Sequence, residues 1–279
     1  LVATAVMQIF IGSLSDRFGR RPVLLACLVL ATAATLMVIY APTVEIFLLG
    51  RVFQATAIGG LVIGRATIRD TVRLDEAASR MGYVTMAMAL GPMVAPVVGG
   101  YLAEIYGWQA TFWIVFAMGL VAIALAWSDM GETNASMGGR LLAQFRAYPL
   151  LVTSRRFWGY SLAAGLVSGA FFALIGGAPY LAAEFYDLPP SHYGYYFAFV
   201  AVGYMLGSFL SGRFASRFGA NRMMMTGSLI TLGGMFASLA LNLADIIHPL
   251  TLFGPMFVVG IGNGITLPSA NASIVSIRP

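Results

Sequence analysis

Charged side chains are scarce in this 279-residue chain, which contains only 10% of them against 59% apolar residues. The mean hydropathy is +0.84. Soluble domains carry about 25% charged residues, so this composition excludes a water-soluble globular domain and predicts a protein embedded in lipid. Cysteine occurs once, as Cys27 within an apolar run, which excludes a disulfide framework. Lysine is absent, and all 16 basic residues are arginine.

Side chains that could perform covalent chemistry are equally few. His192 and His248 fall in predicted loops, and Cys27 stands alone, so no nucleophile and base lie at compatible places. We therefore expect no enzymatic activity, no metal site and no bound cofactor.

Long apolar runs dominate what is present. A helix that crosses about 30 Å of hydrocarbon needs roughly 20 residues, and the continuous runs do not alternate as the strands of a β-barrel would. The sequence predicts an all-α membrane protein with about nine spans. They are Leu1–Leu14, Val23–Tyr40, Val44–Ile68, Met81–Ala103, Thr111–Ser128, Trp158–Ala183, Tyr193–Phe214, Met223–Leu243 and Leu250–Ile277.

Fourteen of the 16 arginines occur in or beside every second predicted loop. They are Arg17, Arg20 and Arg21, then Arg65, Arg69, Arg73 and Arg80, then Arg140, Arg146, Arg155 and Arg156, and finally Arg213, Arg217 and Arg222. The intervening loops carry acidic residues instead, namely Glu45, Glu104, Glu184, Asp187 and Asp245. By the positive-inside rule the arginine-rich loops face the cytoplasm, so the net charge of +5 reports orientation and not nucleic-acid binding.

The chain contains traces of an internal duplication. The charged turn Gly12–Arg21 has a weaker copy at Gly212–Gly219, and the same 200-residue offset relates Glu45 to Asp245, Gly60 to Gly260 and Gly64 to Gly264. We expect an N-terminal half of five spans (1–129), a cytoplasmic linker (130–157) and a C-terminal half of four spans (158–279). Paired helical halves of this kind are typical of secondary transporters, which expose one site to either side in turn. A full match would need one more span before Leu1 and further chain after Pro279.

Several motifs carry a family resemblance. Gly12–Arg21 resembles the loop signature of the major facilitator superfamily, and Arg51–Gly60 and Gly91–Gly100 are similar to its fourth-helix motif and its fifth-helix antiporter motif. Gly64–Asp70 and Gly107–Trp113 resemble the Bcr/CflA branch of drug:proton antiporters. The resemblance covers helices two to ten of twelve, so the first helix and the last two have no counterpart here.

This resemblance implies a pseudo-symmetric bundle of two helical halves in a bacterial inner membrane, working as a monomer. It implies proton-coupled efflux of small amphipathic drugs by alternating access, with the proton gradient as the energy source and the proton-carrying residue in the missing first helix. Two alternatives remain open: an importer of a small solute with the same fold, and a truncated remnant that inserts without transporting. Few charges lie in mid-membrane to bind a polar solute, which disfavours the importer.

The charged turn is the first candidate site. Asp16 and Arg17 lie where a span meets the cytoplasm, and we expect their charges to pair across the halves in one conformation and separate in the other. The alternative is that the turn only sets topology, with Gly19 supplying a positive φ. Ser216 replaces Asp16 in the second copy, so only the first half would carry the full contact. The candidate gating residues are Gly12, Asp16, Arg17, Gly19, Arg20, Arg21, Arg217 and Gly219.

Arg51 is the one strongly charged residue placed well inside a span. An arginine in the membrane costs about 2.5–3.5 kcal/mol on insertion scales, so it is a functional candidate. The resemblance links Arg51 to proton coupling, and Gln54, one helical turn on, would face the same cavity. The alternative is that Arg51 extends to the outer interface beside Glu45.

Two further sets of candidates follow from Gly, Pro and polar or aromatic residues. The antiporter-like segment would form a rigid, kinked packing surface through Gly91, Pro92, Pro96, Gly99 and Gly100. Gly and Pro are also simply commoner in membrane helices. The substrate-binding candidates are Phe171, Tyr180, Tyr204 and Asn263, whose alternative role is ordinary packing or lipid contact.

Overall fold

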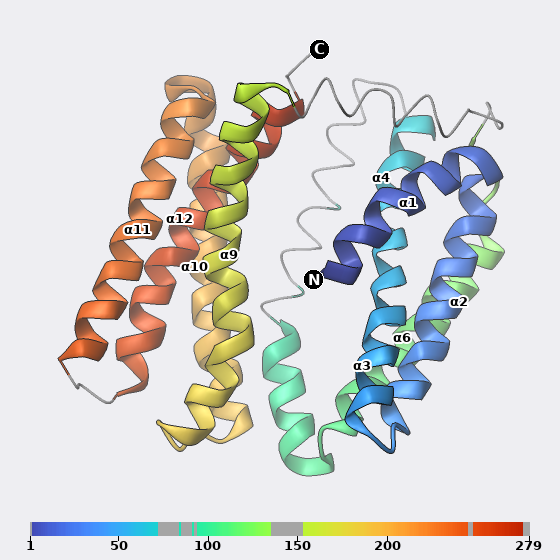
Figure 1. Ribbon diagram of the computed structural model, residues 1–279, viewed down its shortest axis with the longest axis horizontal. Helices are drawn as coiled ribbons and strands as arrows, with labels where there is room; N and C mark the ends of the chain where they lie inside the picture. Colours follow the sequence, from blue (N-terminus) through green and yellow to red (C-terminus); the bar gives the residue numbers. More distant parts are fainter. Residues whose placement is uncertain are drawn as a thin grey trace. The chain divides into compact units, whose positions relative to one another are not determined.

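Helices make up every regular element in the part of the chain that the structure describes (Figure 1). The computed structural model describes residues 2–71, 84, 91, 94–134, 153–244 and 248–275. The elements are α1 (Val2–Phe18), α2 (Arg20–Ile39), α3 (Val44–Gln54), the 3₁₀ turn η1 (Ala55–Ala57), α4 (Ile58–Thr71), an unlabelled helix Val94–Tyr106, α6 (Gln109–Ser128), α9 (Arg155–Glu184), α10 (Pro190–Phe218), α11 (Ala220–Leu243) and α12 (Pro249–Val275). The predicted all-α fold is confirmed.

Seven helical segments among the described residues are long and apolar enough to cross a membrane. They are Arg20–Ile39, Val44–Ile68, Gln109–Ser128, Arg155–Glu184, Pro190–Ala215, Ala220–Leu243 and Pro249–Ile274. The first predicted span forms α1, whose 17 residues leave it just short of this set. About half of the predicted span 81–103 lies outside the described residues, and its described end belongs to the helix Val94–Tyr106.

The chain divides into two compact units. One comprises Leu1–Ala87 with Tyr106–Tyr148, and the other Met88–Ile105 with Pro149–Pro279. The described residues 91 and 94–105, which the duplication assigns to the first half, therefore belong to the second unit. The boundaries of the halves and of the 130–157 linker stay predictions, and residues 135–152 of that linker lie outside the described part.

The first unit has a small apolar core. Ile11 of α1, Cys27 of α2 and Ile63 of α4 are buried together, and Met7, Val23, Leu24, Ile58 and Met130 pack around them. α2 lies against both α3 and α6. By contrast, the hydrophobic segment of α6 has none of its residues buried, as expected for a helix whose apolar side chains face lipid.

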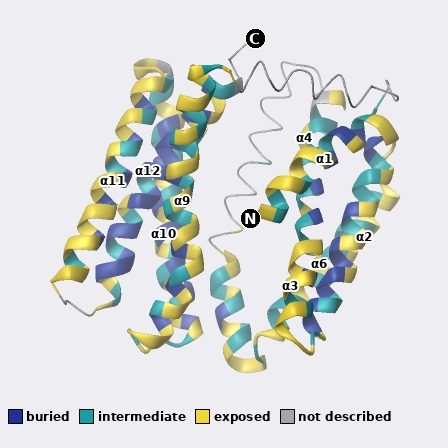
Figure 2. Cartoon of the chain, viewed as in Figure 1, coloured by how far each residue is buried: buried dark blue, intermediate teal, exposed yellow. Residues whose placement is uncertain are grey.

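In the second unit α12 is the central helix. Of its membrane-length segment, 67% is buried, and Figure 2 shows this helix as the darkest of the four. Its side chains Phe253, Met256 and Val259 pack with Leu174 of α9 and Phe197 of α10. α10 and α11 both lie along it.

Glycines allow α12 to approach its neighbours closely. A β-carbon at Gly260 or Gly264 would overlap carbonyl oxygens of α10, those of Val200 and Tyr204. One at Gly234 of α11 would come within 2.9 Å of the Pro255 carbonyl oxygen of α12. Small residues at such crossings let backbones pack in lipid, where apolar side chains gain little by contacting each other. A β-carbon at Gly60 or Gly64, the counterparts in the first unit, would have no described atom of another part of the chain within 4 Å.

The two duplicated turns share one backbone geometry. Gly19 separates α1 from α2 with φ 100° and ψ 152°, and Gly219 separates α10 from α11 with φ 82° and ψ 150°. A residue with a β-carbon rarely adopts these angles. The predicted positive φ at Gly19 is therefore confirmed, and Gly219 repeats it.

Candidate functional site

Arg20 is the centre of the charged turn. Its side chain is buried, with 5% of the residue exposed, although it carries a full charge. Its Nη1 lies 2.5 Å from Asp16 Oδ1 and donates to Ser15 Oγ at 2.6 Å, while its Nε lies 3.1 Å from Asp70 Oδ2. A buried guanidinium needs several acceptors, and here two carboxylates and a hydroxyl supply them.

Ser15 and Asp70 lie within the motifs Gly12–Arg21 and Gly64–Asp70, but neither was a candidate site residue. Asp70 lies at the end of α4, 50 residues from Arg20, so no local spacing indicates the pair. The only signal in the sequence that could have indicated Asp70 is its position, as an acidic residue at the end of the span that follows α2.

The other candidate residues of the turn are more exposed. Arg17 stands over the ring of Phe18, and Arg21 donates from Nη2 to the Trp127 carbonyl oxygen at 2.8 Å. Asp16 pairs with Arg20 of its own turn, four residues on, and the expected pairing across the halves stays a prediction. In the second copy Arg217 stands over Phe218, and the described part shows no ion pair there.

Glu132, which follows α6, holds the charged turn although it lies far from it in the sequence. Both carboxylate oxygens of Glu132 accept backbone N–H groups from the first turn of α2, Arg20 at 2.8 Å and Arg21 at 3.2 Å. Asn134 Nδ2 donates to the Asp16 carbonyl oxygen at 2.8 Å. A β-carbon at Gly19 would overlap the Glu132 carboxylate and displace it, so glycine here keeps this contact as well as allowing the positive φ. A carboxylate also interacts favourably with the positive end of the helix dipole.

Hydrogen bonding sets the protonation of Glu132. Partial burial acts to raise its pKa, but the backbone N–H groups of Asn134, Arg20, Arg21 and Thr133 outweigh this and lower it. Because the pKa of Glu132 in the folded protein lies below that of the free side chain, ionised Glu132 stabilises the folded state fully above the free pKa of about 4.3. This stabilisation is lost as the pH falls through the lowered folded value.

We expect Glu132→Ala to lower the unfolding temperature at pH 7, because a side-chain helix cap contributes about 1 kcal/mol. Glu132→Gln should lose less, since it keeps an acceptor for Arg20 N–H. Thermal unfolding of the purified protein between pH 7 and about pH 2 measures both, because the pH must fall through the lowered pKa of Glu132, with the neighbouring exposed Asp129→Ala as control. The wild type and Glu132→Ala should converge as the pH falls, and a constant difference over this range would contradict the proposed cap.

Arg51 and Gln54 lie together, as their spacing predicts. Arg51 Nη1 donates to Gln54 Oε1 at 2.7 Å, and Gln54 Nε2 donates to Thr35 Oγ1 of α2 at 2.8 Å. The Arg51 guanidinium also stands 5.7 Å from the ring centroid of Phe112 on α6. Arg51 is exposed, Gln54 is half-buried and Thr35 is buried, so the chain of hydrogen bonds runs from the surface of the unit into its interior.

The antiporter-like segment is described in part. Gly91 is helical, Pro92 lies outside the described residues, and Pro96, Gly99 and Gly100 belong to the helix Val94–Tyr106. A β-carbon at Gly100 would overlap the Pro190 carbonyl oxygen of α10, and one at Gly194 of α10 would overlap the Pro96 carbonyl oxygen. Gly100 therefore lies at a close crossing with the beginning of α10, whereas no described atom lies within 4 Å of a β-carbon at Gly91, and the role of the segment stays a prediction.

The four substrate candidates are not brought to one place. Tyr180 is 64% exposed, whereas Asn263 is 1% exposed inside the second unit. Phe171 packs edge-on to Phe172 and beside Phe197, and Tyr204 contributes its backbone to the contact with Gly264. Neither amide atom of Asn263 has a hydrogen-bond partner in the described part, and the same is true of the Thr231 and Thr266 hydroxyls. Their roles in binding stay predictions.

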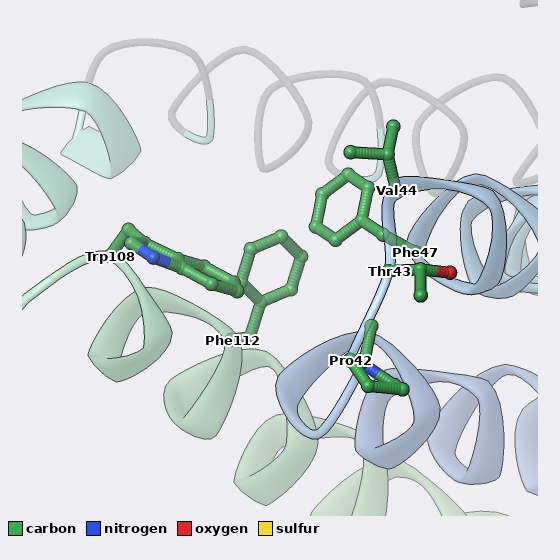
Figure 3. A pocket seen from close by; sticks show the side chains of 7 residues that line it. Pro42, Thr43, Val44, Phe47, Trp108 and Phe112 are labelled. Atoms are coloured by element: carbon green, nitrogen blue, oxygen red, sulfur yellow. The ribbon is translucent and has the colours of Figure 1, made fainter.

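An aromatic pocket of about 600 Å³ lies at the end of the first unit opposite the charged turn. It is lined by Ala41, Pro42, Thr43, Val44, Phe47, Trp108 and Phe112. Figure 3 shows the rings of Trp108, Phe112 and Phe47 beside one another, with the Thr43 hydroxyl directed away from them. The rings pack edge to face at centroid distances of 5.8–6.1 Å. Such aromatics are typical of the membrane interface. Trp108 and Phe112 belong to the motif Gly107–Trp113, but no pocket was predicted there.

In the described ranges, no three His, Cys, Asp or Glu side chains lie close enough together to hold a metal ion.

Curated relatives match nearly all of this chain. A "Bicyclomycin resistance protein homolog" of Haemophilus influenzae is 29% identical over 277 residues, which are 98% of this chain and 69% of the relative. A "Chloramphenicol resistance protein" of Pseudomonas aeruginosa is 28% identical over 264 residues, 94% of this chain and 62% of that protein. The chain thus spans about two thirds of the length of these relatives.

The fold is also found among solved structures. A bacterial homolog of the human lysosomal transporter Spinster, in an inward-facing and occupied conformation, superposes with a TM-score of 0.73 at 22% identity. The match covers 99% of this chain and 64% of that one. The family model described as Major Facilitator Superfamily matches residues 1–279. With the seven apolar spans, these findings show that the chain is a multi-pass membrane protein that belongs to the Major Facilitator Superfamily.

Proposed function

We propose that this chain acts in proton-coupled efflux of small amphipathic drugs across a bacterial inner membrane, by alternating access of two helical halves. The observation that carries the proposal is the similarity, along nearly the whole chain, to transporters whose names record resistance to bicyclomycin and chloramphenicol. The arginine-rich ends of the helices would face the cytoplasm. No resident cofactor is required, since the proton gradient supplies the energy.

The charged turn supports the conformational part of this proposal. The network of Arg20 with Asp16 and Asp70 is partly desolvated, and charge-assisted hydrogen bonds of this kind contribute about 1.5–3 kcal/mol each. A network that is complete in one state and altered in another would bias the equilibrium between them. Glu132 would keep the turn rigid while that happens.

Arg51 would act in coupling without carrying the proton itself, because arginine does not release its proton in proteins. Its guanidinium, oriented by Gln54, would stabilise the deprotonated form of a nearby carboxylate and compete with a bound proton. The carboxylate would come from the family's first helix.

Drug binding would use flat apolar surfaces with few polar groups. Phe171, Tyr204 and Asn263, from α9, α10 and α12, remain the candidates of the second unit. Tyr180, exposed near the end of α9, is better suited to the membrane interface.

We expect Arg51→Ala to abolish proton-driven efflux, because no cation is then left to compete with the proton bound to the coupling carboxylate. The measurement is ethidium accumulation in bacteria that lack other drug pumps and express the complete protein. Cells with Arg51→Ala should accumulate as much dye as cells with an empty vector, and Arg51→Lys should restore part of the efflux.

Arg222→Ala provides the matched control, since it removes an exposed arginine at the start of α11. It should leave efflux unchanged. Membrane protein levels and unfolding temperatures must be equal across the variants. Wild-type efflux by Arg51→Ala would exclude this role for Arg51, and accumulation above the empty vector by the wild type would indicate the importer.

A further inference from the structure

Three buried polar side chains lie where α11 packs against α12. Thr231 of α11 is 6% exposed, and Asn263 and Thr266 of α12 are 1% and 0% exposed. Among the described residues, neither the two hydroxyls nor the amide atoms of Asn263 find a hydrogen-bond partner. Buried polar groups in folded proteins are almost always paired with protein or with ordered water. We call these three residues the polar crossing.

The two threonines of the polar crossing lie on each other's glycines. A β-carbon at Gly227 of α11 would overlap Thr266 Oγ1, and one at Gly262 of α12 would overlap Thr231 Oγ1. Each glycine stands four residues before the threonine of its own helix. Both hydroxyls are therefore held at one place, inside a close contact of two backbones.

Asn263 lies between the two glycine contacts of α12. Gly262 faces α11, whereas Gly264 faces α10. Successive residues of a helix are about 100° apart, so the residue between these glycines points to the junction of α10, α11 and α12. Ser208 of α10, whose backbone nitrogen lies against Gly264, has a buried hydroxyl oxygen that is likewise without a partner in the described ranges.

The first unit has apolar side chains at the equivalent positions. The 200-residue offset relates Ala31, Ile63 and Ala66 to Thr231, Asn263 and Thr266. Ile63 is fully buried and packs with Cys27, the counterpart of Gly227, in the apolar core of its unit. Packing of these helices therefore does not by itself require polar residues, and their presence in the second unit indicates a ligand.

We propose that the polar crossing binds water inside the second unit, with Thr231, Asn263 and Thr266 as its ligands. A buried water makes about 2–4 hydrogen bonds to otherwise unsatisfied groups. The amide of Asn263 offers donors and an acceptor, and each hydroxyl offers both. The ligand is neutral, because α10, α11 and α12 contain no Asp or Glu to balance a buried cation. This site gives Asn263 a ligand other than the drug and does not depend on the proposed transport.

Replacing threonine by valine distinguishes a hydrated crossing from a dry one, because valine keeps the shape and removes the hydroxyl. Thr231→Val and Thr266→Val should each raise the ratio of unfolded to folded protein by roughly two- to tenfold, the effect of losing one hydrogen bond. Unpaired hydroxyls in a dry interior would give the opposite result, since valine would remove their cost. Equilibrium unfolding of the purified protein in mixed micelles measures this ratio. Thr226→Val, at an exposed position of α11, is the matched control and should leave it unchanged.

Hydroxyl-radical labelling detects the water itself. X-rays generate the radicals from bound water, and they oxidise buried side chains that touch it. Ile265 is buried against Gly227 at the crossing, so it should be oxidised in the wild type and severalfold less in Thr266→Val and Asn263→Leu. Phe253 is equally buried in the apolar core of the same unit and should stay unlabelled in every variant.

Three results would overturn the proposal. The first is a valine variant that is more stable than the wild type, or wild-type Ile265 that is oxidised no faster than Phe253. The second is stabilisation by Na⁺ over K⁺ at equal ionic strength, which would indicate a cation site. The third is an Asn263→Leu variant that loses dye efflux while its stability and the labelling of Ile265 stay unchanged, which would assign Asn263 to drug binding.

Discussion

Replacing Arg20 by alanine is expected to destabilise the first unit strongly. The substitution leaves Asp16 and Asp70 without their shared cation and Ser15 Oγ without its donor. Removing one partner of a buried pair costs about 3–5 kcal/mol, and the partial exposure of both carboxylates reduces this to roughly 2–4 kcal/mol here. Thermal unfolding of the detergent-solubilised protein should show a clearly lower midpoint, and less protein should be recovered from the membrane.

Arg17→Ala is the matched control, because it removes an exposed arginine from the same turn. Exposed substitutions usually change stability by about 0.5 kcal/mol or less. Arg20→Lys should be intermediate, since one ammonium group cannot reproduce the planar fork that serves three acceptors. Equal effects of Arg17→Ala and Arg20→Ala would show that the network around Arg20 contributes nothing specific.

A second large effect is expected at Gly264 of α12. Valine at this position would force its β-carbon against the Tyr204 carbonyl oxygen and to within 2.6 Å of the Ser208 backbone nitrogen. Backbone atoms cannot move aside as a flexible side chain can, so the α10–α12 packing must open. Overpacking of this kind costs about 3 kcal/mol. Size-exclusion profiles and unfolding temperatures should both report the loss.

The same helix offers its own control. Gly254 of α12 has no described neighbour within 4 Å of a β-carbon, so Gly254→Val should behave like the wild type. A graded result is expected with Gly264→Ala, which introduces the overlapping atom without the two methyl groups. If Gly254→Val and Gly264→Val were equally stable, close backbone approach would not be what holds α10 and α12 together.

The helices were predictable because a chain in lipid can satisfy its backbone hydrogen bonds in few ways. A continuous apolar run of 20 or more residues can satisfy its backbone in hydrocarbon only as a helix, so composition and length predict the spans around Cys27 or Met223 directly. The turns at Gly19 and Gly219 were predictable for a related reason, since a glycine between charged residues at the end of a span indicates a sharp reversal.

The contacts of the charged turn were predictable only where they are local. Asp16 and Arg20 are four residues apart on the chain and meet as that spacing suggests. Asp70 and Glu132 reach the same turn from 50 and 112 residues away. Such contacts depend on which helices become neighbours, and a single sequence does not contain that information.

The least predictable feature was which face of each span is buried and which faces lipid. Lipid-facing and buried positions are both apolar, so a span shows little of the periodicity that marks the buried side of a soluble helix. Tyr180 and Asn263 illustrate this: the first is exposed and the second is enclosed, yet both appeared as binding candidates. The aromatic pocket around Phe47 and Trp108 was missed because its residues come from two separate turns.

Proton release driven by a drug gradient tests the central claim most directly. Everted membrane vesicles carrying the complete protein are acidified by respiration, and a pH-sensitive dye follows the interior while ethidium or chloramphenicol is added. Our account predicts that drug entry releases protons from the wild-type vesicles and that Arg51→Ala vesicles release none. Drug accumulation without proton release, or protons and drug moving in the same direction, would contradict it.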